Sequence, residues 1–310
     1  MNEQIVILDF GSQYTQVIAR RIRECKVYST IIHYNTSTAV IAEMNPSGII
    51  LSGGPSSVYA RNAPLPDKAI FELGVPILGI CFGHQVMATF LNGKVERGQK
   101  REYGKGTLCV KSTRCRLFDG LPGELQVWNS HGDKLTRLPD GFKAVATTEN
   151  SGYAAIENAR ARFYGLQFHP EVVHTPKGIK IISNFVHKIC GCARKWTMRN
   201  YVEQAVEEIR AQAGREKVIL GLSGGVDSSV AAALIHKAIG NQLTCIFVNN
   251  GVLRANEASV VKKVFARNFK VKLHYEDATN LFMRKLRGVS DPEKKRKIIG
   301  NTFIDVFQKA

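Results

Sequence analysis

Gly79-Ile80-Cys81-Phe82-Gly83-His84-Gln85 is the stretch that decides the fold of this 310-residue chain. The apolar run 75–78 before it predicts a buried strand, and residues 84–91 after it predict a helix. Cys81 then lies on the sharp turn between the two, where a side chain is exposed at the top of a sheet. The glycines two residues to either side fit a close approach of strand and helix that leaves no room for a Cβ. The sequence therefore predicts a nucleophile elbow that carries a thiol.

A second segment, Gln167-Phe168-His169-Pro170-Glu171, supplies the groups that a thiol nucleophile needs. A lone cysteine in an apolar run is usually a small core residue, so the elbow needs this support. In an extended segment, residues two apart point to the same face, which brings His169 and Glu171 side by side. An imidazole accepts the thiol proton, and a carboxylate on its other nitrogen fixes the tautomer. We therefore predict the triad Cys81, His169 and Glu171.

The segment 47–56, Ser-Gly-Ile-Ile-Leu-Ser-Gly-Gly-Pro-Ser, predicts a strand that enters a glycine loop. Free backbone N–H groups in such a loop can point at a developing oxyanion. We expect one donor from Gly54 and a second from Phe82, the residue after the nucleophile. An ordinary tight turn is the alternative interpretation of this segment.

These three segments, in this order, resemble the class I glutamine amidotransferase domain, and the resemblance covers roughly residues 3–190. It implies that Cys81 attacks the side-chain amide of glutamine to form a γ-glutamyl thioester. It also implies that His169 protonates the departing ammonia and then activates the water that releases glutamate. The glutamine pocket would include part of the polar loop 129–133, and its expected contacts are Gln85, Asn129, Ser130 and His131.

The carboxyl-terminal part contains a second strand-turn-helix pattern. A short apolar run at 217–222 predicts a strand, and residues 230–238 predict a helix. Backbone N–H groups at a helix start, together with serine hydroxyls, make an anion site. No Gly-Lys-Ser/Thr ends the loop, so it is not a Walker A motif. A serine-capped turn is the alternative, and the candidate anion-binding residues are Ser223, Gly224, Gly225, Val226, Asp227, Ser228 and Ser229.

The sequence Ser-Gly-Gly-Val-Asp-Ser at 223–228 resembles the pyrophosphate loop of the N-type ATP pyrophosphatases. That resemblance implies ATP as a substrate, adenylylation of a carbonyl oxygen, and Mg²⁺ held in part by Asp227. An amidotransferase domain followed by this loop is similar to the glutamine-hydrolysing GMP synthase family. The stretches 247–254 and 291–300 are also close to that family. The family would use ammonia to convert XMP to GMP through an adenylyl-XMP intermediate, releasing AMP and pyrophosphate.

Arg296, within the basic run 294–297, is a candidate contact for the XMP phosphate, because guanidinium pairs bidentately with phosphate oxygens. Four basic residues in a row are more often a solvated helix face. The chain departs from the family at Asn249, where many members carry an acidic residue. It also stops at Ala310, whereas family members continue through the rest of the pyrophosphatase domain and a dimerisation domain. We therefore expect a truncated chain and expect a homodimer only for the full-length family.

Three other functions stay open beside the leading one. The chain could be a glutaminase whose synthetase partner is another chain, although the loop at Ser223 argues against that. It could also be a truncated chain with glutaminase activity only, or a catalytically silent nucleotide-binding remnant.

Alternating strand and helix patterns predict an α/β fold with two domains of mainly parallel, helix-flanked sheets. We expect an amidotransferase domain at 1–190, a linker at 191–200 and a pyrophosphatase domain at 201–310. Short runs broken by Gly and Pro predict antiparallel additions within 94–170, and the pattern at 66–73 predicts a helix. A further amphipathic helix is expected at 198–213.

The composition agrees with small anionic substrates. The net charge is +17, and +10 of it lies in residues 194–310, where polyanionic ATP and XMP are expected. The sequence has no basic patch interleaved with aromatic residues, which is the pattern that would indicate nucleic-acid binding. No apolar run approaches the roughly 20 residues that span a bilayer, and no signal peptide is recognisable. Seven cysteines without paired Cys-x-x-Cys spacing favour a reducing cytoplasm.

Overall fold

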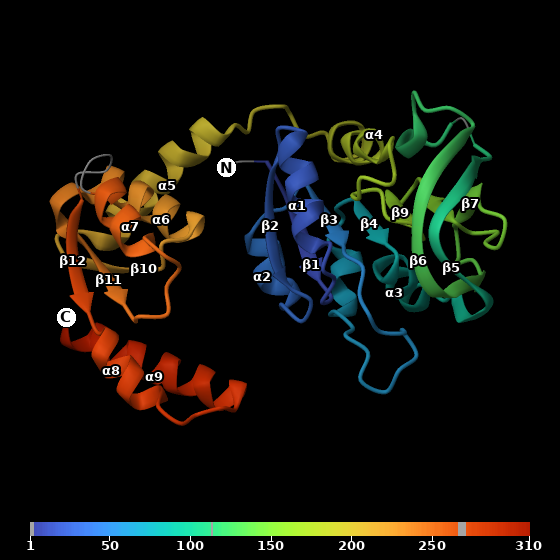
Figure 1. The fold of residues 1–310 in the computed structure, drawn as a ribbon. Coiled ribbons are helices and arrows are strands. Elements are labelled where there is room, and N and C mark those ends of the chain that lie inside the picture. Colours follow the sequence, from blue (N-terminus) through green and yellow to red (C-terminus); the bar gives the residue numbers. More distant parts are fainter. Residues whose placement is uncertain (1–2, 113, 266–270) are drawn as a thin grey trace. The chain divides into compact units, whose positions relative to one another are not determined.

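The computed structural model describes residues 3–112, 114–265 and 271–310 (Figure 1). The chain forms two compact units, Met1–Thr197 and Met198–Ala310. Their boundary falls inside the linker expected at 191–200. Each unit contains a sheet covered by helices, so the predicted α/β class is confirmed.

The first unit is built on a nine-stranded sheet of order β2-β1-β3-β4-β9-β8-β7-β5-β6. The five strands from β2 to β9 are mutually parallel, and β8, β7, β5 and β6 continue the sheet in antiparallel pairing. The expected antiparallel additions within 94–170 are therefore confirmed. The strands are β1 (Gln4–Asp9), β2 (Tyr28–His33), β3 (Gly48–Leu51), β4 (Ile77–Ile80), β5 (Lys94–Val110), β6 (Glu124–Arg137), β7 (Lys143–Thr147), β8 (Ala155–Asn158) and β9 (Phe163–Leu166).

Alternation along β1 divides the core of this unit between the two faces of the sheet. Ile5 and Ile7 point into a cluster with α1, α4 and η3, whereas Val6 and Leu8 point into a cluster with α2, η1 and α3. All four side chains are fully buried. The helical elements are α1 (Thr15–Glu24), α2 (Thr38–Glu43), η1 (Lys68–Glu72), α3 (Phe82–Phe90), η2 (Arg116–Phe118), α4 (Gly178–Ser183) and η3 (Asn184–Ile189).

The helix expected at 66–73 is shorter than predicted. That segment holds only the 3₁₀ helix η1, whose start is capped by the Asp67 carboxylate accepting from the Ala69 N–H. A connection this short is typical of 3₁₀ geometry, which needs fewer residues for its first hydrogen bond.

The second unit is a parallel three-stranded sheet of order β10-β11-β12, with β10 (Val218–Leu222), β11 (Leu243–Asn249) and β12 (Lys272–Asp277). Cys245 and Phe247 of β11 pack with α5, α6 and α7, and Ile246 and Val248 pack with α8 and α9. Helix α5 has the expected bounds. The helical elements are α5 (Met198–Ala213), α6 (Val226–Ile239), η4 (Gly240–Gln242), α7 (Glu257–Val264), α8 (Thr279–Leu286) and α9 (Pro292–Lys309).

One expected element of this unit needs adjustment. Helix α6 begins at Val226 rather than at residue 230, so Val226 to Ser229 form its first turn instead of a loop. In the described part of the chain, no helix combines the length and apolar character needed to cross a bilayer.

Candidate active site

Cys81 occupies the turn between β4 and α3 in a strained backbone conformation. Its φ is 52° and its ψ is −104°, in the positive-φ range that L-residues rarely adopt. A Cβ on Gly83 would lie 2.2 Å from the Leu51 carbonyl oxygen, and one on Gly79 would lie 2.6 Å from the Gly83 carbonyl oxygen. Both glycines are therefore required by the close approach of strand and helix, as the sequence predicted.

Hydrogen bonds from three parts of the fold hold this turn. The Cys81 N–H donates to the Leu166 carbonyl at 2.7 Å, and the Gly83 N–H donates to the Ser52 carbonyl at 3.0 Å. The Cys81 carbonyl accepts from the Gln85 N–H at 3.2 Å. The elbow is thus hydrogen-bonded to β9, to the end of β3 and to its own helix. A strained backbone conformation persists only when the surrounding structure fixes it in several places, as here.

His169 follows β9 and is fixed through its backbone. Its N–H donates to the Trp128 carbonyl at 2.9 Å, and its carbonyl accepts from the Thr175 hydroxyl at 2.7 Å. Bends flank His169 on both sides in the segment 167–171, which is not the extended segment that the sequence suggested. The neighbouring strands and turns set the path of this backbone, and the expected His169–Glu171 pair still forms.

The three predicted catalytic side chains come together. Nδ1 of His169 lies 2.8 Å from Oε1 of Glu171, whose side chain is fully buried. Burial alone would lower the pKa of His169, but the Glu171 charge and the hydrogen bonds to Cys81 and Glu171 outweigh burial. The pKa of His169 is consequently raised well above its usual value. With Nδ1 on the carboxylate, Nε2 remains for the thiol.

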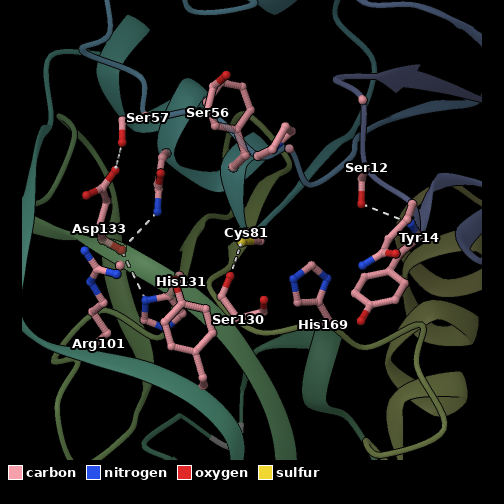
Figure 2. Close-up of a pocket in the computed structure, with 18 of the residues that line it drawn as sticks. Ser12, Tyr14, Ser56, Ser57, Cys81, Arg101, Ser130, His131, Asp133 and His169 are labelled. Carbon is pink, nitrogen blue, oxygen red and sulfur yellow. Dashed lines mark hydrogen bonds between the residues drawn. The ribbon is translucent and has the colours of Figure 1, made fainter.

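Cys81 and His169 line a cavity of about 700 Å³. Cys81 lies in the middle of Figure 2, with Tyr14 and His169 on one side and Arg101, His131 and Asp133 on the other. The Tyr14 ring meets the His169 ring edge-on, with centroids 5.2 Å apart. The Cys81 thiol donates to the Ser130 carbonyl at 3.7 Å. The cavity is large enough for an amino-acid substrate beside the thiol.

Both predicted oxyanion donors line the cavity beside Cys81. Phe82 is the first residue of α3, so its N–H has no intrahelical acceptor. Among the described residues, neither the Phe82 nor the Gly54 N–H donates to a protein acceptor. A Cβ on Gly54 would approach the Phe10 carbonyl oxygen to 3.0 Å, which explains the glycine there.

Three of the four predicted glutamine contacts, Gln85, Ser130 and His131, line the cavity. Asn129 does not; it is buried in β6 beside Gly106. The loop expected at 129–133 is wrong, because these residues belong to β6. Nε2 of Gln85 donates to the Asp133 carbonyl at 3.0 Å and so ties α3 to that strand.

Several residues at this site were missed from the sequence. Nε2 of His131 lies 3.1 Å from Oε2 of Glu102, its cross-strand partner on β5. Burial would raise the pKa of Glu102, but the hydrogen bond and charge of His131 outweigh it and the pKa is lowered. Ser57 and Tyr59 donate to the Asp133 carboxylate at 2.5 and 2.7 Å. Only the folded arrangement of strands and loops reveals these partners, which are far apart in the sequence.

The second candidate site is the turn between β10 and α6. Gly224 has φ +79°, and the Gly225 N–H donates to the Ser223 hydroxyl at 3.2 Å. The Ser228 and Ser229 hydroxyls donate to the Gly225 carbonyl at 3.2 and 2.8 Å. The serines therefore shape the turn themselves. The first N–H groups of α6, from Val226 onward, have no intrahelical acceptor and point out of the helix end.

The remaining predicted residues of this unit lie on its surface. Asp227 is in the first turn of α6, and no group of three or more His, Cys, Asp or Glu side chains in the described residues is placed to hold a metal. Arg296 forms a bidentate pair with Glu293 in the exposed first part of α9, at 2.8 and 3.0 Å. Asn249 ends β11 and donates to the Tyr275 hydroxyl at 3.2 Å.

Comparisons with known proteins divide the chain at the same place. Residues 6–189 match the family model "Glutamine amidotransferase class-I", and residues 197–296 match the model "NAD synthase". GMP synthases (glutamine-hydrolyzing) of Azoarcus sp. (strain BH72) and Staphylococcus epidermidis are 54% and 52% identical over 99% and 98% of this chain. The aligned regions cover 60% and 59% of those proteins, so the chain spans about three fifths of their length.

A solved structure from Thermoplasma acidophilum, provisionally identified as one component of a GMP synthase, is 28% identical with a TM-score of 0.56. The match covers 66% of this chain and 98% of that one. The matched share of this chain is close to the share that the first unit makes up.

Proposed function

The chain belongs to the class-I glutamine amidotransferase family, and on that premise we propose that its first unit hydrolyses glutamine to supply ammonia for the conversion of XMP to GMP. The observation that carries this proposal is the Cys81 thiol on a strained elbow, in contact with an imidazole whose other nitrogen is held by a buried carboxylate. The similarity to GMP synthases supports the choice of XMP as the acceptor.

The proposed hydrolysis begins with the transfer of the Cys81 proton to Nε2 of His169. The resulting thiolate attacks the γ-carbonyl carbon of glutamine, and His169 returns the proton to the departing ammonia. A γ-glutamyl thioester remains on Cys81. His169 then takes a proton from water, the hydroxide attacks the thioester, and glutamate leaves as the thiol is restored. Glu171 keeps the ring oriented and stabilises the imidazolium in both halves.

Negative charge develops on the carbonyl oxygen in each half of this reaction. The N–H groups of Phe82 and Gly54 are the proposed oxyanion donors, because both residues line the cavity and, among the described residues, neither N–H is committed to a protein acceptor. Gln85, Ser130 and His131 are the proposed contacts along the substrate. Asn129 lies beneath them in β6, and we assign it a supporting position in that strand.

The second unit is proposed to activate XMP with ATP. The carbonyl oxygen at purine position 2 attacks the α-phosphate, pyrophosphate leaves toward the turn 223–229, and ammonia displaces AMP from adenylyl-XMP to give GMP. The start of α6 suits a leaving pyrophosphate, since its free N–H groups and helix dipole favour an anion. Asp227 is the proposed protein ligand of Mg²⁺, which usually takes one or two carboxylates beside substrate phosphates.

Arg296 remains the proposed contact for the XMP phosphate. Its side chain is 79% exposed and pairs with Glu293, three residues away on the same helix face. An exposed ion pair of this kind contributes little stability. The Arg296 guanidinium can therefore exchange the Glu293 carboxylate for a dianionic phosphate at a net gain in free energy. A thiol nucleophile also requires a reducing compartment, and we propose that the reaction takes place in the cytoplasm.

One experiment tests the proposal as a whole. The chain is incubated with glutamine, ATP-Mg and XMP, and glutamate, pyrophosphate and GMP are measured separately. All three products support the full activity. Glutamate alone supports a glutaminase that needs the rest of a longer protein for synthesis. The absence of glutamate contradicts the assignment of Cys81, and the absence of all three contradicts the proposed function.

A further inference from the structure

The β5–β6 hairpin contains a large bulge at the edge of the Cys81 cavity. Arg97 is opposite Asp133 and Glu102 is opposite His131, so residues 98–101 of β5 face only Gly132 of β6. Bulges are common beside active sites, where they redirect a side chain. Here the residues that flank and end the bulge, Arg97 and Arg101, both line the cavity.

The stem of Arg101 lies directly along Gly132. Its Cγ, Cδ and Nε would be 3.7–3.8 Å from a Cβ at that position, which is ordinary van der Waals contact. Figure 2 shows Arg101 on the same side of Cys81 as His131 and Asp133, away from His169. The cavity therefore has a reacting side at His169 and a cationic side at the bulge.

In the described part of the chain, Arg97 and Arg101 are not paired with an acidic residue that lines this cavity. Of the described residues that line it, Asp133 alone carries a carboxylate, which already accepts hydrogen bonds from Ser57 and Tyr59. Within the described ranges of the chain, neither Arg97 nor Arg101 forms an ion pair or a side-chain hydrogen bond. A guanidinium with free N–H groups facing a cavity matches a carboxylate ligand in both charge and geometry.

We propose that Arg101 binds the α-carboxylate of glutamine, with Arg97 as a second cation at the rim. This inference rests on the proposed glutaminase activity. When the γ-amide reaches Cys81, the α-carboxylate at the other end of the substrate faces the bulge. The pair of arginines thus selects the free amino acid over a glutamine whose α-carboxyl group is amidated or joined in a peptide. Arg101 acts on substrate binding and takes no part in proton transfer.

The test compares L-glutamine with L-glutaminamide, which keeps the γ-amide but lacks the α-carboxylate. Ammonia release is measured with ATP-Mg and XMP present for the wild type, Arg101→Met, Arg97→Met and the control Arg160→Met. Arg160 is exposed in the turn between β8 and β9 and does not line the cavity. Its substitution removes the same charge elsewhere on the unit.

We expect Arg101→Met to raise KM for L-glutamine roughly 10–100-fold, as for a lost charged hydrogen bond. Its kcat should stay within about twofold, because the contact exists equally in substrate and transition state. KM for L-glutaminamide should not change, and Arg160→Met should match the wild type with both substrates. An unchanged KM for L-glutamine in Arg101→Met overturns the inference, as does an equal rise for both substrates. A rise in KM for L-glutamine in Arg97→Met but not in Arg101→Met overturns the assignment to Arg101.

A covalent probe separates this inference from the proposed function. In L-6-diazo-5-oxonorleucine the diazo carbon takes a proton, the Cys81 sulfur bonds to that carbon and N₂ leaves; peptide mass mapping measures the rate. Arg101→Met should raise the half-saturating probe concentration by a similar factor, while alkylation of Cys81 by iodoacetamide is unchanged. A wild type that neither releases ammonia nor is labelled contradicts the glutaminase function. A wild type that does both, with an Arg101→Met variant identical to it, contradicts only the role of Arg101.

Discussion

Gly83→Ala tests the physical basis of the elbow. The new Cβ would lie 2.2 Å from the Leu51 carbonyl oxygen and 2.5 Å from the Leu51 Cβ, both parts of the rigid strand β3. Relief of these contacts requires α3 to move by about 1 Å from β3, and overpacking of this kind costs about 3 kcal/mol. Alanine recovers about 1 kcal/mol of helix propensity. The net destabilisation is therefore about 2 kcal/mol, since the clash outweighs the propensity.

Two measurements follow from that displacement. The melting temperature of the first unit should fall by about 4–8 °C, as expected for a unit of this size. Glutamate release should fall about 100-fold, because a shift of about 1 Å moves Cys81 out of line with His169. Calorimetry and a glutamate assay record the two effects on the same preparation.

Gly123→Ala and Gly152→Ala are the matched controls. Neither glycine has an atom within 4 Å of its added Cβ, and neither has a positive φ. Both variants should stay within about 0.5 kcal/mol of the wild type. A Gly83→Ala chain with wild-type melting temperature and turnover would refute the argument that close backbone packing creates the elbow.

Three further outcomes are expected. Cys81→Ala should abolish glutamate release but leave pyrophosphate release intact when ammonium, ATP-Mg and XMP are supplied. Glu171→Gln should lower the pKa of His169 in an NMR titration, since the Glu171 charge raises it. Because the pKa of His169 is higher in the folded than in the unfolded state, this group stabilises the fold fully at a pH below its unfolded-state pKa of about 6.5. That stabilisation is lost as the pH rises through the folded-state pKa. The stability gap between wild type and Glu171→Gln should therefore narrow with rising pH. Asp227→Asn should reduce pyrophosphate release roughly 10–100-fold and leave glutamate release unchanged, which separate product assays would check.

The elbow could be predicted from sequence because its causes are local. A buried strand, two glycines at fixed offsets and the start of a helix all lie within one short segment, and they require the same turn. The His169–Glu171 pair was also predictable, since its members are close neighbours along the chain and a short connection keeps them close in space. These predictions needed no knowledge of which strands are neighbours.

The prediction for β6 failed for a reason visible in its burial. Leu125, Val127, Asn129 and His131 alternate on the buried face of that strand. Polar residues occupy the last two of these four positions, so the sequence there has the composition of a solvated loop. Their burial is compensated by partners on other elements, such as Glu102 for His131. Register between β5 and β6 decides this pairing, and hydrophobic patterning alone does not reveal it.

The two candidate sites share one backbone arrangement, a strand-to-helix turn that contains a residue with positive φ, but that residue differs between them. In each unit a parallel strand turns directly into a helix, and free N–H groups at the helix start face the carboxyl end of the sheet, where negative charge is stabilised. In the first unit Cys81 occupies the position despite a cost of about 1–3 kcal/mol, and the proposed hydrolysis needs a side chain there. In the second unit Gly224 occupies it, which leaves bare backbone at the turn proposed to receive pyrophosphate. A Cβ there would also lie 3.2 Å from Oε1 of Glu257. Under the proposed function, the identity of the positive-φ residue thus distinguishes a turn that supplies a nucleophile from one that receives an anion.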